Sequence, residues 1–108
     1  GAAIVARVLA DASLRQHWAE EVGSMVARMK SLRALFAARL TARLPGHDFG
    51  WVTRQRGMFS LLGLPEADIA RLRDEHHIYM PPDGRVNVAG ISDANVDYVA
   101  DSVANLLA

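Results

Sequence analysis

The stretch Leu14–Leu40, LRQHWAEEVGSMVARMKSLRALFAARL, decides the architecture of the first part of the chain. Apolar side chains recur in it in steps of three and four residues, the spacing of one face of an α-helix. The stripe consists of Leu14, Trp18, Val22, Met25, Met29, Leu32, Phe36 and Leu40. It continues for about seven helical turns, until Pro45 and two glycines in LPGHDFG interrupt it. Such a helix is either an ordinary core helix or a bridge between two bodies.

A shorter helix is expected before this stretch. Apolar residues at helical spacing run from Ile4 to Leu9, and the pattern ends near Ala10-Asp11. Ser13, with Gln16 three residues later, is typical of a capping box at the start of the long helix. The chain begins without Met and with the helical pattern already under way, so we expect it to belong to a longer protein.

The composition restricts the class of protein. The chain has 108 residues, 51% hydrophobic and 22% charged, which suits one globular domain. Twelve basic and twelve acidic residues balance to a net charge of zero, so no overall field favours nucleic acid or an anionic membrane. No apolar run has the length of a membrane span or the pattern of a signal peptide. Cysteine is absent, which excludes disulfides and thiolate sites and is compatible with a cytoplasmic protein.

The second part of the chain alternates short strand-like and helix-like segments. Strands are expected at 49–55, within 57–64, at 78–80 and at 85–88, and a helix is expected from Pro65 to about Glu75. Ser92 is expected to cap a last helix with an apolar face of valines and leucines. The element order ααββαββα predicts an α+β fold, in which one long helix precedes a small mixed sheet packed with helices.

Most polar residues show no catalytic pattern. The four histidines are His17, His47, His76 and His77, and their spacing fits no metal site. Ser60 lies in no Gly-x-Ser-x-Gly elbow. The basic residues of the long helix are expected to form a solvated face; they are Arg28, Lys30, Arg33, Arg39 and Arg43.

Arg85, in GRVNVAG (84–90), is the polar residue that stands out. It follows a glycine at the start of an alternating strand pattern, on which Arg85 and Asn87 share one face. It is either a surface charge on a strand or an anion site, since a guanidinium offers a planar fork that matches a carboxylate. Spacing alone leaves both possibilities open.

Two motifs that follow one another along the chain point to a known family. GMFSLLGL (57–64), followed about twenty residues later by GRVNVAGIS (84–92), resembles the C-terminal small domain of the aspartate and aromatic amino acid aminotransferases. These are class I, fold-type I enzymes that depend on pyridoxal phosphate. The likeness extends over the chain, through GAAIVARVL at its start, W-x-x-E-V-x-x-M in the long helix, and R-L-R-x-E-x-x-I-Y between the two motifs.

The resemblance implies roles for two residues. Arg85 matches the arginine that binds the α-carboxylate of the amino acid or 2-oxo acid substrate, and Phe59 matches an aromatic that lines the substrate side of the pocket. The cofactor lysine, the aspartate facing the pyridinium nitrogen and the phosphate-binding residues belong to the family's large domain. No catalytic, cofactor-binding or metal-binding residue is therefore assigned to this chain. The arginine that selects dicarboxylic substrates comes from the partner subunit of a homodimer.

The resemblance also implies a domain organisation. Residues 1–45 are expected to form the N-terminal helical part with a long bridging helix, and residues 46–108 a small α+β domain. His77 stands where family members have a glycine, so the preceding helix is expected to end without a left-handed residue. MPPDG (80–84) likewise replaces a proline-free segment.

The functional expectation is a part of an aminotransferase that moves amino groups between aspartate or aromatic amino acids and 2-oxo acids. The 108 residues alone are expected to be inactive and to bind no pyridoxal phosphate. The alternatives are a non-catalytic interaction or dimerisation domain that retains the fold, and a lyase of the same fold.

Overall fold

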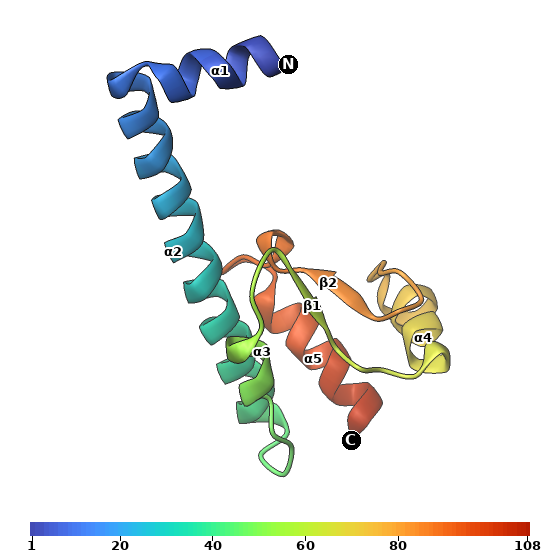
Figure 1. Cartoon of the computed structure of the whole chain (residues 1–108). Helices are drawn as coiled ribbons and strands as arrows, with labels where there is room; N and C mark the ends of the chain where they lie inside the picture. The colour runs from blue at the N-terminus through green and yellow to red at the C-terminus, as the bar shows by residue number, and fades with distance from the viewer.

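A computed structural model describes residues 1–108, all of the chain. The elements in order are α1 (Ala2–Ala10), α2 (Ala12–Arg43), α3 (Gly50–Arg54), β1 (Phe59–Leu61), α4 (Glu66–His76), β2 (Arg85–Asn87), the 3₁₀ turn η1 (Val88–Gly90) and α5 (Val96–Leu107). Figure 1 shows α1 running sideways from the N-terminal end of α2, while α3 and α5 lie along the C-terminal half of α2. The expected fold class, helices around a small sheet after one long helix, is confirmed, but the sheet has two antiparallel strands and is not mixed. None of the helices is long and apolar enough to cross a membrane.

The start of α2 is organised by Asp11 and not by Ser13. The Asp11 carboxylate accepts hydrogen bonds from the backbone N–H groups of Ser13 at 3.0 Å and Leu14 at 3.1 Å. It thereby satisfies two of the N–H groups that a helix leaves unpaired at its first turn. The capping box expected at Ser13 is wrong, because the helix begins one residue before it.

The apolar stripe of α2 divides into two halves. No residue before Leu32 is buried, whereas Leu32, Phe36 and Leu40 are buried on one face of the helix. The core that they join comprises Leu32, Phe36, Ala37, Leu40, Leu44, Phe49, Val52, Leu72, Val88, Ile91, Val96, Ala100 and Val103. One half of α2 is thus a core helix, and the other half projects from the packed part of the molecule (Figure 1).

Two of the four expected strands are absent. Residues 50–54 form helix α3, because Phe49 and Val52 are both buried and lie three residues apart, the spacing of a helical turn. The Asp48 carboxylate accepts from the Gly50 N–H at 2.8 Å and starts this turn. Residues 78–80 form no strand, since the Ile78 N–H is already bonded to Leu72 O at the end of α4.

The end of α4 corrects a further expectation. His77 has φ 54° and ψ 31°, the left-handed conformation. Its N–H bonds to Arg73 O at 3.1 Å, and the Ile78 N–H bonds to Leu72 O at 2.9 Å. Together these bonds end the helix as a glycine would. The helix therefore has its left-handed residue, with histidine in that position.

The turn before α5 also differs from the expectation. Asn95, not Ser92, organises it, because Asn95 Oδ1 accepts from the Ser92 N–H and Asn95 Nδ2 donates to Gly90 O, each at 2.8 Å. The helix itself begins at Val96. Arg43 then joins α5 to the end of α2, through Asp101 and through Asp97 at 2.9 Å.

Candidate functional site

Arg85 is presented by a turn that depends on glycine. Gly84 has φ 73°, a conformation that side chains disfavour, and its N–H bonds to Pro81 O at 2.9 Å. The Asp83 carboxylate accepts from the Arg85 N–H at 3.1 Å. These bonds start β2 at Arg85 and fix where its side chain leaves the backbone.

The two-stranded antiparallel sheet brings the two predicted site residues together. Its register pairs Phe59 with Asn87 and Leu61 with Arg85. Residues paired in this way share one face, so Phe59 and Arg85 are diagonal neighbours on the exposed side of the sheet. The Arg85 guanidinium carbon lies 5.2 Å from the centroid of the Phe59 ring, within the range of a cation–π contact.

The outer nitrogens of the Arg85 guanidinium have no protein partner. The side chain is 47% exposed, and its nearest carboxylate is Asp83, with Nε to Oδ2 at 3.7 Å. Nη1 and Nη2 make no hydrogen bond to the protein. A planar pair of N–H donors over an aromatic ring can bind a carboxylate with two parallel hydrogen bonds.

Arg33 lies directly behind this sheet and is 3% exposed. Nη1 donates to Val52 O at 3.1 Å and to Ser60 Oγ, and Nη2 donates to Gly57 O at 2.6 Å and to Phe59 O at 2.9 Å. No carboxylate pairs with it, and burial lowers the pKa of its guanidinium.

The expectation that Arg33 belongs to a solvated face is wrong. A signal for its burial was present in the sequence. Arg33 is four residues after Met29 and three before Phe36, so it lies on the apolar stripe itself.

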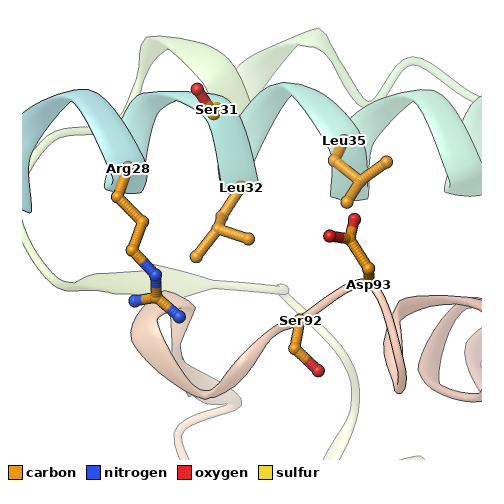
Figure 2. A pocket seen from close by; sticks show the side chains of 6 residues that line it. All are labelled: Arg28, Ser31, Leu32, Leu35, Ser92 and Asp93. Atoms are coloured by element: carbon orange, nitrogen blue, oxygen red, sulfur yellow. The ribbon is translucent and has the colours of Figure 1, made fainter.

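Two hollows lie beside α2, and neither contains Phe59 or Arg85. A groove of about 1010 Å³ runs between α2 and residues 53–58, with Lys30 and Arg33 among its lining residues. A smaller one of about 400 Å³ lies between α2 and the turn before α5. Figure 2 shows Arg28 reaching into this smaller hollow from α2, and Asp93 pointing toward Leu35. No group of three or more histidine or acidic side chains lies together as a metal site would require.

The sequence comparisons identify the family. The family model described as aminotransferase class I and II matches residues 1–103. The chain belongs to the class I and II aminotransferases. It is 42% identical over 107 residues to aspartate aminotransferase of Haemophilus influenzae, and 42% identical over 108 residues to aromatic-amino-acid aminotransferase of Pseudomonas aeruginosa. These matches cover 99% and 100% of this chain but 27% of each relative.

A solved structure agrees with this family. The aromatic-amino-acid aminotransferase of Burkholderia pseudomallei, covalently bound to pyridoxal phosphate, matches with a TM-score of 0.92 and 42% identity. The match covers 98% of this chain and 27% of that chain. The predicted resemblance to aspartate and aromatic aminotransferases is confirmed, and the chain spans about a quarter of the length of these relatives.

The residues of this aminotransferase chain do not by themselves fit pyridoxal phosphate. A cofactor aldehyde is bound covalently by a lysine amine, and the chain has one lysine, Lys30. Lys30 lines the groove beside α2, whereas neither Arg85 nor Phe59 does. We therefore assign no chemical step on the cofactor to these residues.

Proposed function

We propose that this chain is the substrate-carboxylate-binding part of a pyridoxal-phosphate-dependent aminotransferase that acts on aspartate or aromatic amino acids and on 2-oxo acids. The observation that carries the proposal is the free, half-exposed guanidinium fork of Arg85 above the Phe59 ring. In this proposal the cofactor and the lysine that binds it belong to the parent enzyme outside these 108 residues.

Arg85 would bind the α-carboxylate of the substrate through two charge-assisted hydrogen bonds. Two parallel bonds fix the rotation of the carboxylate as well as its position, so the bonds at the α-carbon take a defined direction. The Phe59 ring would hold the guanidinium plane from below and give the substrate an apolar wall. A lysine in place of Arg85 would keep the charge but lose the fork.

The partner of this chain, we propose, is the large domain of the same enzyme. Large apolar side chains are exposed along α1 and the first half of α2: Ile4, Val5, Leu9, Leu14, Trp18, Val22, Met25 and Val26. So many exposed large apolar side chains in one part of a chain are typical of an interface. Residues 1–45 would then contain the bridge between the domains, residues 46–108 the small domain, and the enzyme would work as a cytoplasmic homodimer.

The same exposed surface fits a second function, a non-catalytic interaction domain that retains the fold. The two functions differ in what precedes Gly1 in the gene. A large α/β domain with a cofactor lysine supports the aminotransferase, and its absence supports the interaction domain.

The decisive experiment is Arg85→Lys in the full-length parent. We expect kcat/KM to fall by roughly 100-fold or more, because the bidentate contact is lost, while the absorbance of the bound cofactor stays unchanged. Arg71→Lys is the matched control, since Arg71 is an exposed arginine of α4, outside the sheet, and is paired with Glu75 at 3.1 Å. Unaltered kinetics of Arg85→Lys would remove Arg85 from the site.

A further inference from the structure

Arg33 is a buried cation without a counter-ion. Fully buried charged groups are rare in proteins unless they are paired, yet Arg33 is 3% exposed and its four hydrogen-bond acceptors are all neutral. Three acceptors are backbone carbonyls and the fourth is the hydroxyl of Ser60, which is itself 1% exposed. The two outer nitrogens of a guanidinium carry four N–H bonds, so each of these bonds has one acceptor here.

The acceptors lie on both sides of Phe59 in the chain. Arg33 binds Gly57 O, two residues before Phe59, then Phe59 O itself, and then the side chain of Ser60. The carbonyl between them, Met58 O, accepts from the Val88 N–H at 2.8 Å. The backbone carbonyls of residues 57, 58 and 59 thus accept hydrogen bonds from Arg33 on α2 and from Val88, the residue that follows β2.

The two faces of β1 separate the anchor from the site. Ser60 points inward to Arg33, whereas Phe59 points outward, where it is 44% exposed and lies against the Arg85 guanidinium. A shift of the 57–60 segment relative to α2 would therefore move the Phe59 ring, and with it the support of Arg85.

We propose that Arg33 is a positioning residue of the carboxylate site: its guanidinium fixes Phe59, and through Phe59 the Arg85 fork, relative to the long helix α2. This inference rests on the proposed function of Arg85. A merely structural Arg33 would contribute to folding but would leave the affinity for the carboxylate unchanged. The side chain has to be arginine because lysine offers three donors on one nitrogen and cannot reach four acceptors in one plane.

The test uses the full-length holoenzyme and phenylpyruvate, a 2-oxo acid with a single carboxylate. The dissociation constant of phenylpyruvate and the thermal unfolding midpoint are measured for Arg33→Lys, Arg85→Lys and the double variant. We expect Arg33→Lys to raise the dissociation constant of phenylpyruvate by about tenfold in the wild-type background. In the Arg85→Lys background we expect it to raise this constant by less than about twofold, because the effects of two residues that act through one another are not additive. Arg39→Lys, an exposed arginine of the same helix, is the control and should bind phenylpyruvate as the wild type does.

Ser60→Ala keeps the inference testable if Arg33→Lys fails to fold. It removes one acceptor of Arg33 and leaves the three carbonyls, so we expect about threefold weaker binding in a folded enzyme. If Arg33→Lys, or Ser60→Ala where Arg33→Lys does not fold, lowers the unfolding midpoint but binds phenylpyruvate as the wild type does, the inference is overturned. Additive effects of Arg33→Lys and Arg85→Lys in the double variant would overturn it as well. Arg85→Lys with normal binding would instead overturn the proposed function, and the role of Arg33 with it.

Discussion

At the scale of single residues, the candidate site is one arginine whose surroundings leave its fork free. Three neighbours decide how available it is: Gly84 sets the turn, Phe59 supports the guanidinium plane, and Asp83 supplies the only nearby carboxylate. Asp83 belongs to the PPDG segment, one of the departures from the family pattern noted in the sequence. Its charge can compete with a substrate carboxylate for the same cation.

Asp83→Ser should therefore strengthen carboxylate binding by the full-length parent. An exposed ion pair contributes little, so the expected gain is at most about fivefold in the dissociation constant of a 2-oxo acid. A serine hydroxyl can still accept from the Arg85 N–H and preserve the turn. The gain should shrink in high salt, because salt screens the Asp83 carboxylate. Equal affinities at low salt would show that Asp83 does not compete.

His77 is the second residue with a measurable consequence. A left-handed conformation costs a non-glycine residue about 1–2 kcal/mol, and the His77 side chain is exposed and packs little. His77→Gly should raise the free energy of unfolding by about 0.5–1 kcal/mol in urea denaturation, after the entropy of glycine in the unfolded chain is counted. His76→Gly, within the last turn of α4, should lower it by about 0.3–0.5 kcal/mol, the difference between the helix propensities of histidine and glycine. Equal losses from both substitutions would contradict this account.

At the scale of elements, long-range contacts decide which segments become helix or strand. The expected helices at 4–10, over the stripe Leu14–Leu40, from Pro65 and near the C-terminus are all present, because each has an apolar stripe of sufficient length. The segment 49–55 has too few residues to distinguish the apolar period of a helix from that of a strand. The burial of Phe49 and Val52, three residues apart, selects the helix. The ends of helices were the least predictable, since Asp11 caps α2 in place of Ser13, while α5 has no side-chain cap and Asn95 holds the turn before it.

The link between α2 and α5 gives a dependence of stability on pH. A hydrogen bond from Arg43 lowers the pKa of the Asp101 carboxyl below its ordinary value. As the pH falls, Asp101 is therefore protonated in the unfolded state at a higher pH than in the folded state. The stabilisation of the folded state by the Arg43–Asp101 pair is complete above the unfolded-state pKa and is lost as the pH falls through the folded-state pKa. Asp101→Asn should lower the urea midpoint at about pH 7, and the difference from the wild type should shrink as the pH falls below about 4, the ordinary pKa of an aspartate, and vanish once the pH is below the folded-state pKa.

Asp93→Asn is the control for that experiment. Asp93 is an exposed carboxylate without an ion pair in the structure, so its replacement should leave the midpoint near neutral pH unchanged. A pH-independent effect of Asp101→Asn would show that the Arg43 pair does not contribute through charge.

At the scale of the whole molecule, the chain is a packed body with a projecting arm. It measures 53 × 25 × 23 Å with a radius of gyration of 17.3 Å, whereas a compact chain of this length has about 13 Å. The arm is α1 with the first half of α2 (Figure 1), and it carries exposed apolar side chains such as Trp18 and Met25. Exposed apolar side chains of this kind are typical of an interaction surface.

Oxidative footprinting can test whether the large domain is that body. In the isolated chain Trp18 and Met25 are 49% and 61% exposed, so both should be oxidised readily. In the full-length parent we expect both to be protected at least about fivefold if the domain interface buries them. The reference is Trp51, which is half-buried against the core and should change less than Trp18. Equal oxidation of Trp18 in the two proteins would contradict the proposed interface.

The sequence by itself determined the family and the helices with a long apolar stripe, and by resemblance it singled out Arg85 and Phe59 as candidates. Helical stripes and the two motifs are local patterns, and local patterns are readable without coordinates. The tertiary structure decided which half of α2 is buried, that the fork of Arg85 is free, and that Arg33 lies beneath Phe59. The position of Arg33 depends on contacts between residues 19 to 27 positions apart along the chain, as for Arg33 with Val52 and with Ser60. Such contacts join segments that are distant in the sequence, and no periodicity along the chain records them.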